Sequence, residues 1–176
     1  MPFRIEPRAY DDAAVVPLIA AVQQEYVDLY GGVDDDPTDP RTFTPPHGLF
    51  LLGLLDGRPV ATGGFRRLDD SAAEIKRMFV APEARGRGLG RRMLTELEAA
   101  AWRAGVRRIV LNTGYRQPVA MRLYDSTGYE RVEGFGHYAD QGGARFYAKE
   151  LRTAPSDDDG PPRQGENGPF GREVSG

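Results

Sequence analysis

The chain has 176 residues, of which 40% are hydrophobic and 28% charged, and its formal net charge at pH 7 is −3. This composition is ordinary for a globular domain and supports one sizeable core. The absence of cysteine excludes disulfides, thiolate metal sites and a cysteine nucleophile, and two histidines are too few for a histidine-rich metal centre. The charge balance also lacks the strong basic excess of a nucleic-acid-binding domain.

The two ends of the chain differ from its middle in composition. Residues 1–12 are charged and lack an apolar signal core, and the longest apolar stretch, 48–55, is far too short to span a bilayer. We therefore expect a cytoplasmic protein with no membrane contact. The acidic, Gly- and Pro-rich segment 153–176 has few apolar residues, so we expect it to be disordered behind a folded domain at 1–152. Phe170 alone supports the alternative of a partner-binding peptide.

The first part of the chain predicts a strand, a helix and an irregular loop. Phe3–Glu6 alternates between apolar and polar residues, as a short strand does. Asp11 or Asp12 can cap a helix that runs to Tyr30 with apolar residues at helical spacing. The following segment, 34–48, is rich in Pro and Asp and is expected to be a loop.

Three consecutive antiparallel strands are predicted next. The apolar runs Leu49–Leu55 and Pro59–Arg66 are joined by Asp56-Gly57, a dipeptide that favours the positive backbone angles of a tight hairpin turn. A second turn at 69–70 leads into a third strand, Ala72–Val80.

The second half alternates helices and strands. We expect a long helix at 88–104, a buried strand at 108–112, a shorter helix at 118–127 and two final strands at 129–132 and 144–151. This order predicts a mixed α/β (α+β) domain with a mostly antiparallel central sheet and flanking helices.

A glycine-rich loop between the third strand and the long helix is the most informative segment. Free backbone N–H groups at a helix start bind phosphate oxygens, and glycines let a ligand approach the backbone. Arginines around this helix start add positive charge. The loop residues that we expect to bind phosphate are Arg85, Gly86, Arg87, Gly88, Leu89, Gly90 and Arg91.

Two familiar phosphate motifs do not fit this loop. A nucleoside-triphosphate P-loop needs Lys-Ser/Thr after its last glycine, where this chain has Arg91-Arg92. The dinucleotide fingerprint needs a glycine at position 91 and follows a first parallel strand, not an antiparallel meander. A merely flexible turn is the remaining alternative, and the alternation of glycine with arginine directly before a well-patterned helix argues against it.

The chain resembles the GCN5-related N-acetyltransferases. Their acetyl-CoA loop reads Gln/Arg-x-x-Gly-x-Gly/Ala, and residues 85–90 fit it; their downstream helix often reads Asn-x-x-Ala-x-x-x-Tyr-x-x-x-Gly-Phe/Tyr, and residues 117–129 fit it except for Gln117 in the first position. The resemblance covers residues 3–152. The two motifs together, at this spacing, are a strong signal.

The resemblance implies how acetyl-CoA is bound as co-substrate. The pyrophosphate would lie on the N–H groups of residues 86–91, and the pantetheine arm would pair with the backbone of Met78, Phe79 and Val80 where two strands splay apart. Gln117 would contribute from the downstream helix. No metal is required.

The resemblance implies catalytic roles for two side chains. Tyr124 is expected to protonate the leaving CoA thiolate or bond its sulfur, with a packed core aromatic as the alternative. Glu74 resembles the position of a catalytic glutamate that accepts the amine proton, and a surface strand residue paired with Lys76 or Arg67 is equally compatible. His137 and Tyr138 are rival groups near the acceptor.

The predicted function is transfer of the acetyl group of acetyl-CoA to a primary amine by direct attack in a ternary complex. A backbone N–H near Phe79 could stabilise the oxyanion, and the acidic run 34–36 could attract a cationic amine. A transferase for longer acyl groups and a CoA-binding regulatory module are the alternatives. The sequence leaves open the acceptor and the oligomeric state, a homodimer included.

Overall fold

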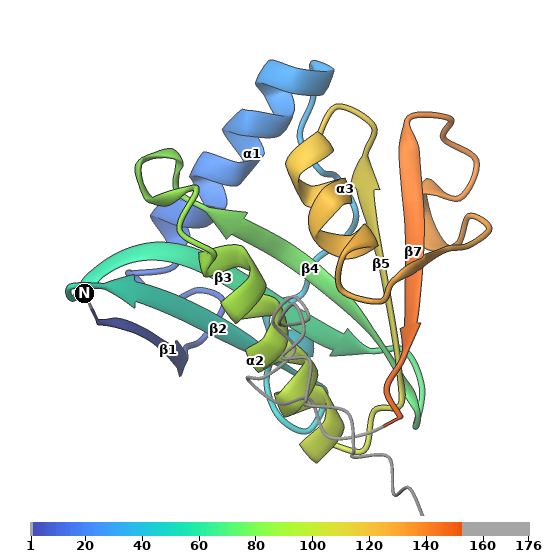
Figure 1. The fold of residues 1–176 in the computed structure, drawn as a ribbon, viewed down its shortest axis with the longest axis horizontal. Helices are drawn as coiled ribbons and strands as arrows, with labels where there is room; N and C mark the ends of the chain where they lie inside the picture. The colour runs from blue at the N-terminus through green and yellow to red at the C-terminus, as the bar shows by residue number, and fades with distance from the viewer. Residues whose placement is uncertain (1, 153–176) are drawn as a thin grey trace, which may run out of the picture.

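The computed structural model describes residues 2–152, which form one seven-stranded sheet with three α-helices (Figure 1). The elements are β1 (Phe3–Pro7), α1 (Val16–Tyr30), β2 (Gly48–Leu55), β3 (Arg58–Arg67), β4 (Ala72–Val80), α2 (Leu89–Arg103), β5 (Arg108–Gly114), α3 (Pro118–Asp125), β6 (Glu130–Arg131) and β7 (Ala144–Glu150). The strand order is β1-β2-β3-β4-β5-β7-β6, and β4–β5 is the parallel pair in an otherwise antiparallel sheet. The predicted mixed α/β fold is confirmed. The expected disorder of 153–176 lies outside the described residues.

The hairpin between β2 and β3 forms where the sequence predicts it. Asp56 and Gly57 have φ angles of 52° and 78°, the left-handed conformation that a two-residue hairpin turn requires. The turn places Leu55 opposite Arg58, and a shift between Gly53 and Leu54 sets the register of the remaining residues of the two strands.

Helix α1 begins at Val16, later than predicted. Residues before it form a turn, in which the Asp12 carboxylate accepts a hydrogen bond from the Ala14 N–H at 2.8 Å. The Asp12 carbonyl accepts from the N–H groups of Val15 and Val16. Asp12 therefore caps a local turn instead of the helix itself, as short polar side chains often do.

Helix α2 packs across β3 and β4 at very short range (Figure 1). Met93 and Leu97 on this helix are fully buried. A Cβ atom on Gly63 of β3 would lie 2.8 Å from Leu97 Cδ1 and 2.9 Å from Met78 Sδ, so a larger residue there would require these side chains to shift. This packing fixes the start of α2 relative to β4.

Strands β4 and β5 separate after a short paired region (Figure 1). They pair only from Ala72 to Glu74 and from Arg108 to Val110, although β4 continues to Val80 and β5 to Gly114. β5 pairs with β7 along its whole length, so β5 stays in the sheet while β4 diverges. The predicted splay is confirmed, and it leaves backbone groups of both strands facing a gap.

Candidate active site

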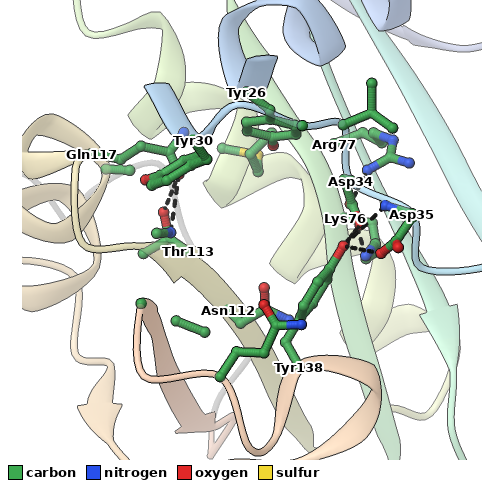
Figure 2. A pocket seen from close by; sticks show the side chains of 18 of the residues that line it. Tyr26, Tyr30, Asp34, Asp35, Lys76, Arg77, Asn112, Thr113, Gln117 and Tyr138 are labelled. Carbon is green, nitrogen blue, oxygen red and sulfur yellow. Dashed lines mark hydrogen bonds and ion pairs between the residues drawn. The ribbon is translucent and has the colours of Figure 1, made fainter. Parts of the chain in front are cut away.

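A cleft of about 350 Å³ occupies the gap between β4 and β5. Its walls come from the end of α1 with residues 32–35, from β4, from β5 and α3, and from the loop that precedes β7 (Figure 2). Tyr26, Tyr30, Tyr124 and Tyr138 line it together with charged and amide side chains. A ligand in this cleft therefore meets aromatic rings on several sides.

A bulge in β4 brings consecutive residues to the cleft. The pairing with β3 shifts register between Thr62 and Gly64, and Arg77 has a φ of 60°, which is a strained value for a non-glycine residue. The Thr62 hydroxyl donates to the Arg77 carbonyl at 2.8 Å and holds the bulge. As a result Lys76, Arg77 and Met78 all line the cleft, where regular alternation would turn every second residue away.

The glycine-rich loop ends at the start of α2. Gly86 and Gly88 have φ angles of 79° and 75°, and an added Cβ would meet nothing within 4 Å at either residue. The backbone angle, not lack of space, is therefore what requires glycine. Gly88 is the N-cap of α2, so the first N–H groups of this helix lack intrahelical partners and are oriented for an anion.

The arginines of the loop differ in their contacts. Arg85 donates from Nε to the Val80 carbonyl at 2.8 Å and forms a 2.7 Å ion pair with Glu25 of α1. Arg91 donates to the Ser126 hydroxyl at 2.9 Å, which ties the start of α2 to the end of α3. Arg87 has no side-chain partner among residues 2–152. Arg85 braces the loop, while Arg87 is available to a ligand.

Gln117, which departs from the family pattern, stabilises the turn between β5 and α3. Its Oε1 accepts hydrogen bonds from the Thr113 hydroxyl at 2.7 Å and from the Gly114 N–H at 3.1 Å (Figure 2). It thereby closes the turn between β5 and α3. The longer side chain reaches back across this turn and still lines the cleft with its amide.

Tyr124 is 5% exposed and lines the cleft from α3. Its ring packs on those of Tyr129 and Tyr147, with centroids 5.5 and 5.6 Å away. Its hydroxyl forms no hydrogen bond with another described residue. Every fully buried side-chain N or O atom in the described chain has a hydrogen-bond partner, so the Tyr124 hydroxyl is not fully buried. The hydroxyl therefore opens into the cleft. Burial raises the pKa of Tyr124, so the phenol is protonated and can donate at neutral pH.

Glu74 occupies a different environment from Tyr124. It is the last β4 residue paired with β5, is 5% exposed, and does not line the cleft. Its carboxylate accepts from Arg66 at 2.7 and 3.0 Å. Arg66 also binds Asp36, which in turn binds Lys76. Glu74 therefore reaches the cleft only through a chain of ion pairs.

Asp34 is held in the cleft wall by two cations and a phenol. Its carboxylate pairs with Lys76 at 3.1 Å and with Arg77, and it accepts from the Tyr138 hydroxyl at 2.5 Å (Figure 2). Burial alone would raise the pKa of Asp34, but Lys76, Tyr138 and Arg77 outweigh it and hold this pKa well below its usual range. Sequence reasoning assigned Asp34 only a weak role in attracting amines and missed its pairing with the Lys76-Arg77 dipeptide. Two adjacent cations in a strand with several apolar residues were the available signal.

The loop before β7 is tied to the segment after α1 by the two residues that the sequence analysis named as rivals. The Tyr138 hydroxyl accepts from the Asp35 N–H at 3.0 Å, besides its bond to Asp34. His137 Nε2 lies 2.9 Å from Asp35 Oδ1. These contacts join residues about a hundred positions apart and close one side of the cleft.

Known proteins share both the sequence pattern and this fold. The model of the Acetyltransferase (GNAT) family matches residues 19–129. The IAA acetyltransferase of Azospirillum brasilense is 34% identical over 139 residues, covering 78% of this chain and 91% of that protein. The N-alpha-acetyltransferase RimI of Mycobacterium tuberculosis is 35% identical over 107 residues, covering 57% of this chain and 66% of that protein.

Solved structures agree with the architecture. A Klebsiella pneumoniae protein described as an acyl-CoA N-acyltransferase superimposes with a TM-score of 0.72 at 29% identity, covering 85% of this chain and 97% of that chain. A GNAT acetyltransferase of Elizabethkingia anophelis, solved with acetyl-CoA bound, shares the fold with a TM-score of 0.62 at 17% identity, over 85% of this chain and 98% of that chain. The chain belongs to the acetyltransferase (GNAT) family and is an acetyl-CoA-dependent N-acetyltransferase.

No helix in the described part of the chain is long and apolar enough to cross a membrane. Residues 2–152 also hold no group of three or more His, Cys, Asp or Glu side chains arranged to bind a metal ion.

Proposed function

We propose that the protein transfers the acetyl group of acetyl-CoA to a primary amine by direct attack within a ternary complex. The observation that carries this proposal is the open hydroxyl of Tyr124 inside the gap between β4 and β5. A thioester lying along β4 meets a protonated donor on one side and an accessible cleft on the other. Proximity of the two bound reactants supplies much of the rate acceleration.

The donor is held mainly by backbone groups. The pyrophosphate lies on the N–H groups from Gly86 to Arg91, with charge from Arg87. The pantetheine arm pairs with the unpaired edge of β4 at Met78, Phe79 and Val80. What supports this placement is the left-handed glycine at the N-cap of α2 and the missing strand partner beyond Glu74.

The chemical step breaks one bond and forms another. The amine nitrogen attacks the thioester carbon, a backbone N–H of β4 near Phe79 stabilises the oxyanion, and the C–S bond breaks as the C–N bond forms. The thiolate takes the Tyr124 proton and leaves as the CoA thiol, and the proton lost by the amine passes to solvent and returns to Tyr124. Donating groups fixed before the reaction lower the barrier without reorganisation.

Neither Glu74 nor Asp34 is well placed to act as the general base. Glu74 could accept the amine proton only through the Arg66–Asp36–Lys76 chain of ion pairs, so its catalytic role stays a prediction. Asp34 is a weak base because Lys76 and Arg77 hold its pKa down. Water in the cleft is therefore the acceptor that we favour.

A thiol-release assay tests the function. Acetyl-CoA is incubated with the protein and each of several amines: 2-phenylethylamine, spermidine, L-phenylalanine, L-phenylalaninamide and an alanine-initiated peptide. Names of relatives, such as N-alpha-acetyltransferase RimI, support including peptide N-termini. Amine-dependent release of CoA with an acetylated product is expected. Tight CoA binding without release would favour the regulatory module, and faster release from octanoyl-CoA would favour the longer-acyl alternative.

A further inference from the structure

The charged groups of the cleft wall are already paired with one another. Asp34 binds Lys76 and Arg77, and Asp36 binds Lys76 and Arg66. Arg66 also binds Glu74, so three acids balance three bases in one cluster. Lys76, Arg77 and Arg66 are therefore not available as uncompensated cations for an acidic substituent of the acceptor.

Negative charge remains at the mouth of the cleft. The Asp35 side chain is 71% exposed, and its side-chain partners are His137 and Tyr138 rather than Lys or Arg. The negative charge of Asp35 would repel an acceptor carboxylate that enters the cleft. The cations deeper in the cleft, Lys76 and Arg77, are already paired with acidic side chains and would not compensate for this repulsion.

Asn112 and Gln141 both line the cleft with carboxamides that have no partner among the described residues, and Asn112 is the more buried of the two. Asn112 is half-buried on β5, two residues beyond the last residue paired with β4, and lines the cleft (Figure 2). The Asn112 carboxamide forms no hydrogen bond with the described residues. Every fully buried side-chain N or O atom among those residues has a partner, so the carboxamide is accessible from the cleft. A carboxamide offers two donors and an acceptor together.

We propose that Asn112 selects the acceptor by hydrogen-bonding a neutral carboxamide next to the attacking amine, as in an α-amino amide or the first residue of a peptide. The inference rests on the proposed N-acetylation. Asn112 lies two residues beyond the last β4–β5 pair and lines the same cleft as Tyr124, so one acceptor can be near both side chains. A carboxamide can both donate to and accept from Asn112, whereas a simple amine lacks this group and a free amino acid replaces it with a charge.

Three matched acceptors test the selection. Steady-state kcat/KM is measured with L-phenylalaninamide, 2-phenylethylamine and L-phenylalanine, and is expressed per unprotonated amine because a carboxamide lowers the pKa of the neighbouring amino group. The amide should exceed the simple amine by about three- to tenfold, as one or two neutral hydrogen bonds provide. The free amino acid should fall below both.

The decisive measurement is the ratio of kcat/KM for L-phenylalaninamide to kcat/KM for 2-phenylethylamine, compared between variants. The pKa values of the two acceptors are the same for every variant, so they do not affect this comparison. In Asn112→Leu the ratio should fall by about three- to tenfold, while acetyl-CoA affinity by calorimetry stays unchanged. Gln24→Leu, the same kind of change on the exposed face of α1, should keep the parent's ratio. Asn112→Ala gives the same test if leucine lowers the melting temperature.

Two outcomes overturn the inference while leaving the proposed function intact. An unchanged ratio in Asn112→Leu would mean that Asn112 does not contact the carboxamide. Weaker acetyl-CoA binding by this variant would place Asn112 in the donor site. Release of no CoA by the parent protein with any amine overturns the proposed function itself, and this inference with it.

Discussion

Tyr124 has the two properties that a proton donor to a thiolate needs, a phenol that is protonated at neutral pH and a hydroxyl that is open to the cleft. Tyr124→Phe removes the hydroxyl and keeps the ring packed on Tyr129 and Tyr147. We predict that kcat falls by about 100-fold, the low end for acid–base groups, because a thiolate is already a good leaving group. Acetyl-CoA affinity should hardly change.

The matched control for this variant is Tyr147→Phe. Tyr147 packs on the same ring, but its hydroxyl bonds Arg131 and it does not line the cleft. Steady-state kinetics at saturating amine should show the loss only in Tyr124→Phe. Equal kcat in both variants would remove Tyr124 from the mechanism.

Gly88 carries a second prediction at the scale of one residue. Gly88→Glu should abolish acetyl-CoA binding, because the new carboxylate would lie beside the pyrophosphate at the start of α2. The backbone angle of 75° also penalises any side chain, by roughly 1–2 kcal/mol. Gly88→Ala shares that penalty without the charge and is the control. Calorimetric affinity in folded Gly88→Glu equal to that of Gly88→Ala would contradict the placement of the phosphates.

Individual residues were predictable from sequence where a backbone requirement selects them. Gly86 and Gly88 are needed for their positive φ angles, and the motif located them directly. Glu74 was less predictable, because its partner Arg66 lies on a neighbouring strand and only the sheet register brings the two opposite each other. The open carboxamide of Asn112 gave no signal, since a lone asparagine in a strand has no distinctive spacing.

Among the elements, the segment from Asp34 to Asp36 depends most on its ionic contacts. The pKa of Asp34 is lowered in the folded protein, so its carboxylate stabilises the fold above its unfolded pKa of about 4, and this contribution is lost as pH falls toward the folded pKa. We predict that the melting temperature decreases below about pH 4 and that Asp34→Asn flattens this dependence. Melting curves from pH 3 to pH 7 for both proteins measure the difference.

An equally steep loss in Asp34→Asn would assign the acid sensitivity to other carboxylates. Asp36 is the comparison, because its pKa is also lowered, with burial opposed by Lys76 and Arg66. The Asp36→Asn variant should flatten the same acid limb to a smaller extent, since Asp34 has the larger lowering.

Element types followed from local patterns, and element ends did not. The hairpin at Asp56-Gly57 and the strand Ala72–Val80 match their predictions because turn chemistry and apolar runs specify them. The start of α1 moved to Val16 because Asp12 bonds its own turn, and α3 ends at Asp125 rather than at residue 127. Local hydrogen bonds that compete with the helix determine where it begins and ends, and the spacing of apolar residues does not reveal these bonds.

At the scale of the whole molecule, the sheet explains where the site lies. Two antiparallel groups of strands meet at the single parallel pair of the described sheet, and the contact between them lasts only from Ala72 to Glu74. Their divergence creates the cleft, whose wall includes Asp34 and Asp35. The order of elements predicted this topology through the family resemblance, while the ionic wall required the three-dimensional register.

The last prediction concerns where the folded unit ends. β7 stops at Glu150, and buried Leu151 donates its N–H to the Arg107 carbonyl at 2.8 Å. The last core side chain and its backbone hydrogen bond are therefore in place before residue 153. Truncation after Arg152 should leave the melting temperature and kcat/KM for acetyl-CoA nearly unchanged, because few apolar groups are removed with residues 153–176. Truncation after Glu150 is the matched control and should lower the melting temperature, since it deletes the buried Leu151 side chain, whose full burial stabilises by about 1.5–3 kcal/mol. A loss of several degrees already on truncation after Arg152 would mean that residues 153–176 dock on the domain.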